Sequence, residues 1–80
     1  MADCPQLDWT PTVIDGEHLR DVARDFNNKL TYEVGVVPGH HYLMWNAYPG
    51  LCSKGNFPSE ESAKTEAQKE QERRWIAAQQ

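Results

Sequence analysis

The side chains in this chain that could perform chemistry are its three histidines and two cysteines. His40 and His41 are adjacent, and the other nitrogen and sulfur donors are Cys52, Cys4 and His18. Zinc sites usually take ligands at spacings such as C-x2-C or H-x3-H, because one element then binds the metal at two points. No such pair occurs here, and adjacent strand residues point to opposite faces. A polar turn with one half-buried imidazole is therefore favoured over a metal site.

Catalysis would need a general base, a reacting partner and an orienting group within one cleft. Asp15, Glu17 and His18 are close in sequence but match an ordinary polar turn, and Cys52 has only Lys54 as an activating charge. The chain contains no G-x-S-x-G, P-loop or dinucleotide fingerprint. We therefore expect a protein that is not an enzyme and that needs no cofactor.

The composition indicates one acidic domain. Its 80 residues suffice for a single domain, with residues 1–6 as a flexible N-terminal tail. The net charge of −4 disfavours direct binding of nucleic acid but permits a basic protein partner, including one that holds nucleic acid. No apolar run spans a membrane and no secretory signal is visible, so we expect a cytoplasmic protein. Cys4 and Cys52 are expected to be free thiols there, with any pairing between them left open.

Strand signals are clearest in the middle of the chain. Residues 30–37 alternate apolar and more polar side chains, Pro38-Gly39 predicts a turn, and residues 41–47 return as a second strand. The short loop makes this an antiparallel hairpin. Residues 7–10 and 51–53 are expected to add short strands, the first of them stopped by a proline.

Residues 17–26 fit two structures. From Leu19 to Phe26 apolar residues recur at i, i+3, i+4 and i+7, the stripe of an amphipathic helix. A strand would place Asp21 and Asp25 on one face, which is a poor core face. The pattern favours the helix, with the strand as the alternative.

The C-terminal segment predicts a long helix that begins after Ser59. Ser59 can accept a hydrogen bond from the first turn, and Glu60 and Glu61 suit the positive end of the helix dipole. The expected inward stripe is Ala63, Ala67, Gln71, Trp75 and Ala78. The predicted fold class is therefore α+β, with two to four antiparallel strands packed against this helix and a second short helix as an option.

The aromatic residues give the best hint of a partner surface. Tyr42 and Met44 share one face of the second hairpin strand, and Trp45 lies on the other. A sheet covered on one side only would expose some of them as interface anchors, although a core role explains them equally well. The predicted partner-binding residues are Tyr42, Trp45 and Tyr48 as anchors, with Asp21, Asp25 and Glu33 as steering charges.

Part of the chain follows the pattern G-x-F-x-S-x-E-x-A-K-x-x-A-Q, then E-x-R. The matching residues are Gly55, Phe57, Ser59, Glu61, Ala63, Lys64, Ala67, Gln68, Glu72 and Arg74. Together with Trp9 and the strand around Glu33, this resembles a class of short phage and prophage proteins with a small antiparallel sheet followed by such a helix. In that class the segment before Tyr32 is often extended, which favours a strand over residues 17–26.

The resemblance implies a non-catalytic phage protein that binds and inhibits a host protein or ribonucleoprotein complex. Its most concrete form is an anti-CRISPR protein that covers a nucleic-acid-binding surface or locks a conformation in the host cytoplasm, as a monomer or homodimer. The alternative is a small structural or accessory phage protein, or a homodimer, with no host target. A metal-binding protein that uses His40, His41 and Cys52 is the third hypothesis.

Overall fold

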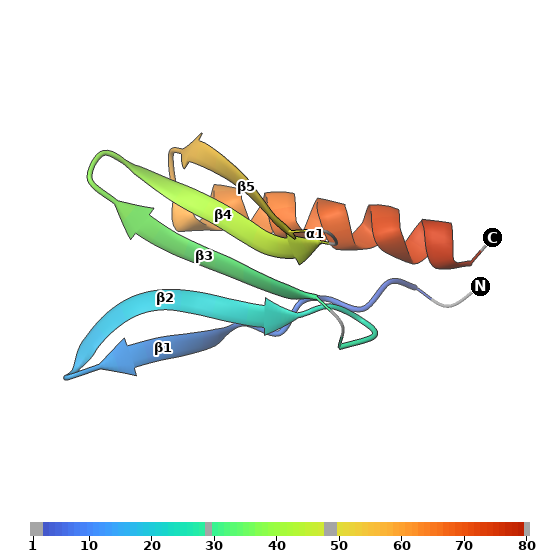
Figure 1. Cartoon of the computed structure of the whole chain (residues 1–80), viewed down its shortest axis with the longest axis horizontal. Helices are drawn as coiled ribbons and strands as arrows, with labels where there is room; N and C mark the ends of the chain where they lie inside the picture. Colours follow the sequence, from blue (N-terminus) through green and yellow to red (C-terminus); the bar gives the residue numbers. More distant parts are fainter. Residues whose placement is uncertain (1–2, 29, 48–49, 80) are drawn as a thin grey trace.

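The computed structural model describes residues 3–28, 30–47 and 50–79 as a five-stranded antiparallel sheet with one helix (Figure 1). The elements are β1 Thr10–Ile14, β2 Glu17–Arg24, β3 Thr31–Val37, β4 His40–Ala47, β5 Gly50–Phe57 and α1 Glu60–Ala78. Neighbouring strands follow chain order, so the sheet is a meander. The predicted α+β class is confirmed, whereas two to four strands was too low a count.

The helix predicted over residues 17–26 is wrong, because residues 17–24 form strand β2. It pairs with β1 on one side and β3 on the other. The two carboxylates that made a strand face look unsuitable both have partners: Asp21 contacts Lys64 of α1, and Asp25 Oδ1 accepts the N–H of Leu30 at 3.2 Å. These contacts offset the cost of burying charge. Within the described ranges, α1 is the only helix.

The edge strands begin and end elsewhere than the sequence predicts. Strand β1 starts at Thr10, where the predicted strand over residues 7–10 ended, and it contains Pro11. A proline is tolerated there because an edge strand need not donate on its outer side. The strand predicted over residues 51–53 is part of the longer β5, which is bulged opposite His41 and Leu43.

The hairpin of β3 and β4 is confirmed. Val36 lies opposite His41, and Val37 opposite His40, on either side of the turn at Pro38-Gly39. The preceding hairpin, of β1 and β2, turns through Asp15 and Gly16, which have φ angles of 53° and 79°. Aspartate and glycine are among the residues that enter this left-handed region most readily, so they suit a two-residue hairpin loop.

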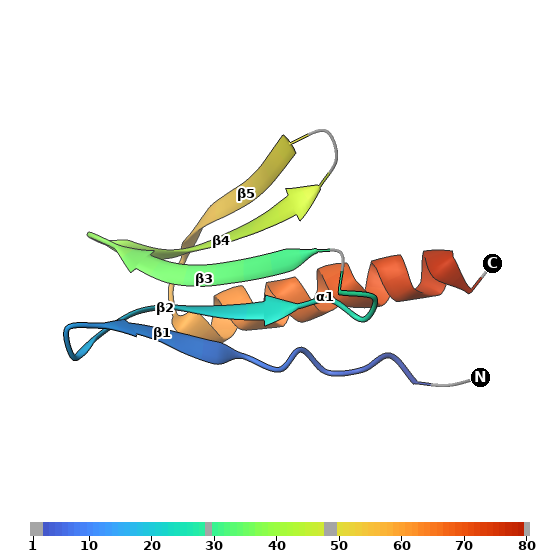
Figure 2. The ribbon, with the colours of Figure 1, turned by 60° about the horizontal axis from the view of Figure 1, so that its bottom comes forward.

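Helix α1 covers one face of the sheet and encloses the core (Figures 1 and 2). The core residues are Leu7, Ala23, Leu30, Tyr32, Val34, Leu43, Trp45, Ala63 and Ala67. The predicted cap is confirmed, since Ser59 Oγ accepts the N–H of Ser62 at 3.1 Å. Ala63 and Ala67 are fully buried, as small residues are where a helix approaches a sheet closely. Across the described residues, no helix has both the length and the apolarity to cross a membrane.

The segment before β1 lies along α1. The carbonyl of Pro5 accepts hydrogen bonds from Gln68 Nε2 at 3.1 Å and Gln71 Nε2 at 2.6 Å, and the N–H of Leu7 donates to Gln68 Oε1 at 2.9 Å. These bonds bring Leu7 into the core. The single domain and the flexible tail over residues 1–6 stay predictions.

The buried hydroxyl group of Tyr32 allows a test of how the core contributes to stability. Tyr32 is fully buried, and in the part of the chain that the structure describes its hydroxyl has no hydrogen-bond partner. Burial raises the pKa of Tyr32 to about 12. Because an unpaired buried hydroxyl keeps its desolvation cost, we expect Tyr32→Phe to leave the free energy of unfolding unchanged or to raise it by up to about 1 kcal/mol. Urea denaturation measures this, and a clear loss of stability would reveal a hidden partner such as a bound water.

Candidate functional site

The sheet divides at one end into two diverging hairpins. Pairing between β2 and β3 runs only as far as Arg20 opposite Gly35. Residues 17–19 of β2 and 36–37 of β3 therefore extend past the last paired residues, and Figure 1 shows the β1–β2 and β3–β4 hairpins separating toward their turns. We call the gap between residues 17–19 and 36–37 the fork, and the two hairpins its arms.

A β-bulge in β2 turns His18 toward the helix side of the sheet. The register moves from Thr12 opposite Arg20 to Val13 opposite His18, so Leu19 is an extra residue in β2. Without the bulge, alternation would place residues 18 and 21 on opposite faces. With it, His18 Nε2 reaches a carboxylate oxygen of Asp21 at 2.7 Å.

Four titratable side chains meet where the fork opens over the start of α1. Lys64 Nζ lies 2.6 Å from Asp21 Oδ2 and 3.1 Å from Glu60 Oε1. Among the described residues, His18, Asp21 and Glu60 are the one group whose potential metal ligands all lie within 4.8 Å of one another. The Lys64 ammonium contacts both carboxylates, so a metal ion would have to displace it. We call these four residues the charged cluster.

The charged cluster favours the ionised forms of Asp21 and Lys64. Burial alone would raise the pKa of Asp21, but hydrogen bonds with Glu60, Lys64 and His18 lower it well below its usual range. Burial likewise opposes the charge on Lys64, but the two carboxylates outweigh it and raise the pKa of Lys64 above its usual value. An ion pair held this strongly links β2 to α1 and is poorly suited to exchanging protons near neutral pH.

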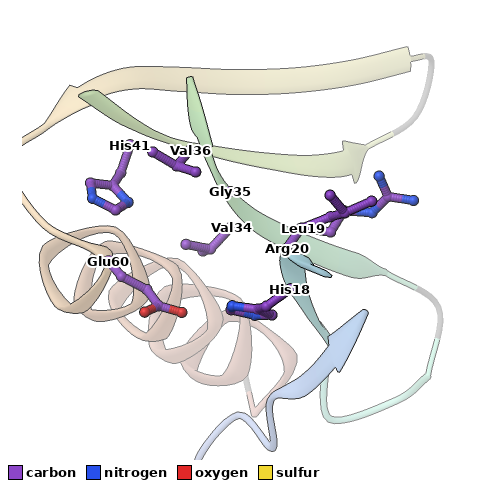
Figure 3. Close-up of a pocket in the computed structure, with 8 residues that line it drawn as sticks. All are labelled: His18, Leu19, Arg20, Val34, Gly35, Val36, His41 and Glu60. Atoms are coloured by element: carbon purple, nitrogen blue, oxygen red, sulfur yellow. The ribbon is translucent and has the colours of Figure 1, made fainter. Parts of the chain in front are cut away.

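A small recess lies in the fork beside the charged cluster (Figure 3). It has a volume of about 90 Å³ and is lined by His18, Leu19, Arg20, Val34, Gly35, Val36, His41 and Glu60. Figure 3 shows the imidazoles of His18 and His41 and the Glu60 carboxylate around the space over Val34. A recess of this size, lined about equally by polar and apolar groups, suits one side chain of a ligand.

Exposed apolar side chains gather on the fork arms. Six large apolar side chains are exposed among the described residues, and only Ile76 of α1 lies elsewhere. The other five are Val13, Ile14, Leu19, Val36 and Val37. Acidic side chains flank them at Asp15 and Glu17 of the β1–β2 hairpin and at Glu60. Apolar groups concentrated within a polar rim are typical of protein-binding surfaces.

Tyr42 and Glu33 lie on the face of the sheet opposite α1, both half-buried. Tyr42 Oη donates a hydrogen bond to Glu33 Oε2 at 2.9 Å, and Glu33 Oε1 lies 3.4 Å from Arg20 Nε. The Tyr42 ring lies across Gly35, where a Cβ atom would come within 2.6 Å of ring atom Cε1. Burial and the adjacent Glu33 carboxylate raise the pKa of Tyr42. Tyr42 and Glu33, two of the predicted partner-binding residues, are thus neighbours at the surface and are joined by a hydrogen bond.

The structure corrects the expected exposure of three other predicted residues. Trp45 is 8% exposed and packs in the core beside Tyr32, with ring centroids 6.5 Å apart, so it is no surface anchor. Asp21 and Asp25 are 5% and 4% exposed, and Asp21 faces Lys64 of α1, so neither side chain lies open at the surface. Tyr48 lies outside the described residues.

The residues of the third hypothesis are not brought together on one face. His41 lines the fork recess, whereas the neighbouring His40 lies on the opposite side of β4, as strand alternation requires. The Cys52 side chain lies outside the described part of the chain. Cys4 is a free thiol whose pKa is raised by burial and by Glu72.

Local sequence could not have identified the fork. Val36 and Val37 continue the alternation of β3, and nothing near them shows that pairing with β2 ends at Gly35. The bulge at Leu19 lies where this pairing ends, and no turn residue marks that bulge. The one available signal was that His18, Asp21 and Lys64 are titratable residues on segments that had to pack together.

Comparisons of the chain with protein-family models, curated proteins and solved structures find no match. The structure itself defines the class: a small α+β domain with a five-stranded antiparallel sheet, covered on one face by a helix and forked at one end.

Proposed function

We propose that this protein is a non-catalytic binding protein whose fork arms dock onto a basic, partly apolar surface of another protein. Five exposed apolar side chains on the two fork arms, of which Leu19 and Val36 line a recess bordered by Glu60, carry this proposal. Burial of those side chains would supply the contact free energy. Asp15, Glu17 and Glu60 would complement positive charge on the partner, and the net charge of −4 would speed the encounter.

Most specifically, we propose inhibition of a host nucleic-acid-handling complex by a phage-encoded protein, such as an anti-CRISPR protein. Proteins that hold nucleic acid present basic surfaces to its phosphates, and these are the surfaces that an acidic fork complements. The resemblance of residues 55–74 to short phage proteins supports the same target class. Inhibition would follow from occupying the surface, with no catalytic group or cofactor required.

Substitution on a fork arm tests this function. We expect the tagged protein to retain a nucleic-acid-handling complex from a host lysate at low salt and less of it at moderate salt. Val36→Glu should weaken the affinity for the purified complex at least roughly tenfold, because it places a charge within an apolar contact. Ile76→Glu is the matched control, since Ile76 is exposed to a similar extent on α1 and should bind as the native chain does.

Two outcomes would contradict the proposed function. Equal binding by Val36→Glu and Ile76→Glu would remove the fork from the interface. Self-association with no retained complex would favour the accessory or homodimeric phage protein.

A further inference from the structure

We infer that the recess binds one arginine side chain of the partner, whose guanidinium group lies beside His18 and His41 and donates to the Glu60 carboxylate. This inference rests on the proposed function and names the side chain that the fork recognises. Three features support it: the position of the recess in the fork, its size and lining, and the charge around it.

The recess opens where the two fork arms present apolar side chains. Leu19 of β2 and Val36 of β3 are both exposed, and both line the recess. A partner that covers the fork arms would therefore lie over the recess as well. A partner side chain that enters the recess would be enclosed by protein, where an ion pair is screened less than at an open surface.

The size and lining of the recess suit a guanidinium group. Its volume is about 90 Å³, and water occupies roughly 30 Å³ per molecule in the liquid, so it admits one group of about three or four heavy atoms. Figure 3 shows the imidazoles of His18 and His41 around the space over Val34. A guanidinium is planar, stacks on aromatic faces and is weakly hydrated, whereas a lysine ammonium is strongly hydrated. A half-apolar lining therefore favours arginine over lysine.

The charge around the recess selects a cation. Asp21 and Glu60 share the ammonium of Lys64, which lies 2.6 Å from the first carboxylate and 3.1 Å from the second. With the imidazoles neutral, these three groups keep one negative charge that is not balanced. Glu60 carries the accessible part of it, because its side chain is 43% exposed whereas Asp21 is buried. An arginine can therefore bind Glu60 while Lys64 stays on Asp21.

The arginine of this chain that lines the recess does not fill it. Arg20 Nε lies 3.4 Å from Glu33 Oε1, on the face of the sheet opposite α1. Figure 3 shows the Arg20 guanidinium directed away from the space that His18, His41 and Glu60 surround. The recess therefore keeps the Glu60 carboxylate for a cation supplied by another molecule.

Capped tripeptides test the recess on the full chain. The probe is acetyl-GRG-amide, compared with the same peptide carrying citrulline, which has the shape of arginine without its charge, or norleucine, which is aliphatic. In a nuclear magnetic resonance titration, we expect the arginine peptide to shift the amides of Leu19, Val36 and His41 in a saturable manner. The citrulline and norleucine peptides should bind at least about tenfold more weakly, because neither can form the ion pair.

A conservative substitution of Glu60 tests the same contact from the other side. Glu60→Gln should weaken the binding of the arginine peptide, and of the purified partner complex, at least about tenfold. Glu61→Gln is the matched control, since Glu61 is the neighbouring carboxylate in the first turn of α1 and does not line the recess. It should bind both as the native chain does.

The outcomes separate this inference from the proposed function. Equal binding of the arginine and citrulline peptides, or tighter binding of the norleucine peptide, would overturn the arginine site. A partner complex that ignores Glu60→Gln but is weakened by Val36→Glu would also overturn it and leave the proposed function standing. Partner binding that ignores Val36→Glu would overturn both.

Discussion

Replacing Asp21 with alanine is expected to lower the free energy of unfolding by about 3 kcal/mol. Asp21 is buried and binds both His18 and Lys64, so its carboxylate joins β2 to α1. Its removal would leave the ammonium of Lys64, a side chain only 28% exposed, with Glu60 as its remaining carboxylate partner. Breaking one side of a buried pair costs more than the pair contributes, because the other charge stays desolvated.

Urea denaturation followed by circular dichroism measures the loss, and a double-mutant cycle with Lys64→Met isolates the pair. We expect Asp21→Ala to cost clearly less in the Lys64→Met background, since no ammonium is then left unpaired. Equal costs in both backgrounds would show that the ion pair does not stabilise the fold.

The same carboxylate predicts a loss of stability in acid. Its pKa in the folded protein is lowered from the ordinary 3.8, so its contribution is complete above that value and is lost as the pH falls through it toward the folded pKa. Below about pH 4, the native chain should therefore lose progressively more stability than Asp21→Asn as the pH falls. If the free energy of unfolding fell equally with pH in the native chain and in Asp21→Asn, Asp21 would not be the carboxylate responsible for the loss of stability in acid.

Gly35→Ala is expected to lower the free energy of unfolding by about 1–3 kcal/mol. In most strand interiors this change is favourable, because glycine loses more backbone entropy on folding. Here the added methyl group would overlap the Tyr42 ring, so the ring would have to leave its position and give up the hydrogen bond to Glu33. The steric term outweighs the entropic one and decides the sign.

The Tyr42→Ala background provides the control for this change. With the ring absent, Gly35→Ala should be neutral or stabilising, so the sign of its effect on the urea midpoint should change. A similar loss in both backgrounds would mean that the close approach of Tyr42 is not what requires glycine at position 35.

Sequence alone determined the features that depend on residues close together in the chain. The cap at Ser59, the hairpin around Pro38-Gly39 and the buried Ala63 and Ala67 are all confirmed. Each rests on hydrogen bonds or side-chain spacing within one element or one turn, where periodicity and turn chemistry are sufficient. The same alternation separated Tyr42 from Trp45 on β4, although it could not tell which of the two faces α1 would cover.

Tertiary structure decided strand β2, and with it the fork and the charged cluster. Residues 17–26 carry the spacing of a helix, but pairing with strands on both sides outweighs that local preference. Asp21 is acceptable in a buried face only because Lys64, far along the chain, supplies the opposite charge. No short window of sequence contains both partners. Only the packing of α1 against the sheet brings them together, buries Asp21 and leaves Val36 exposed at the fork.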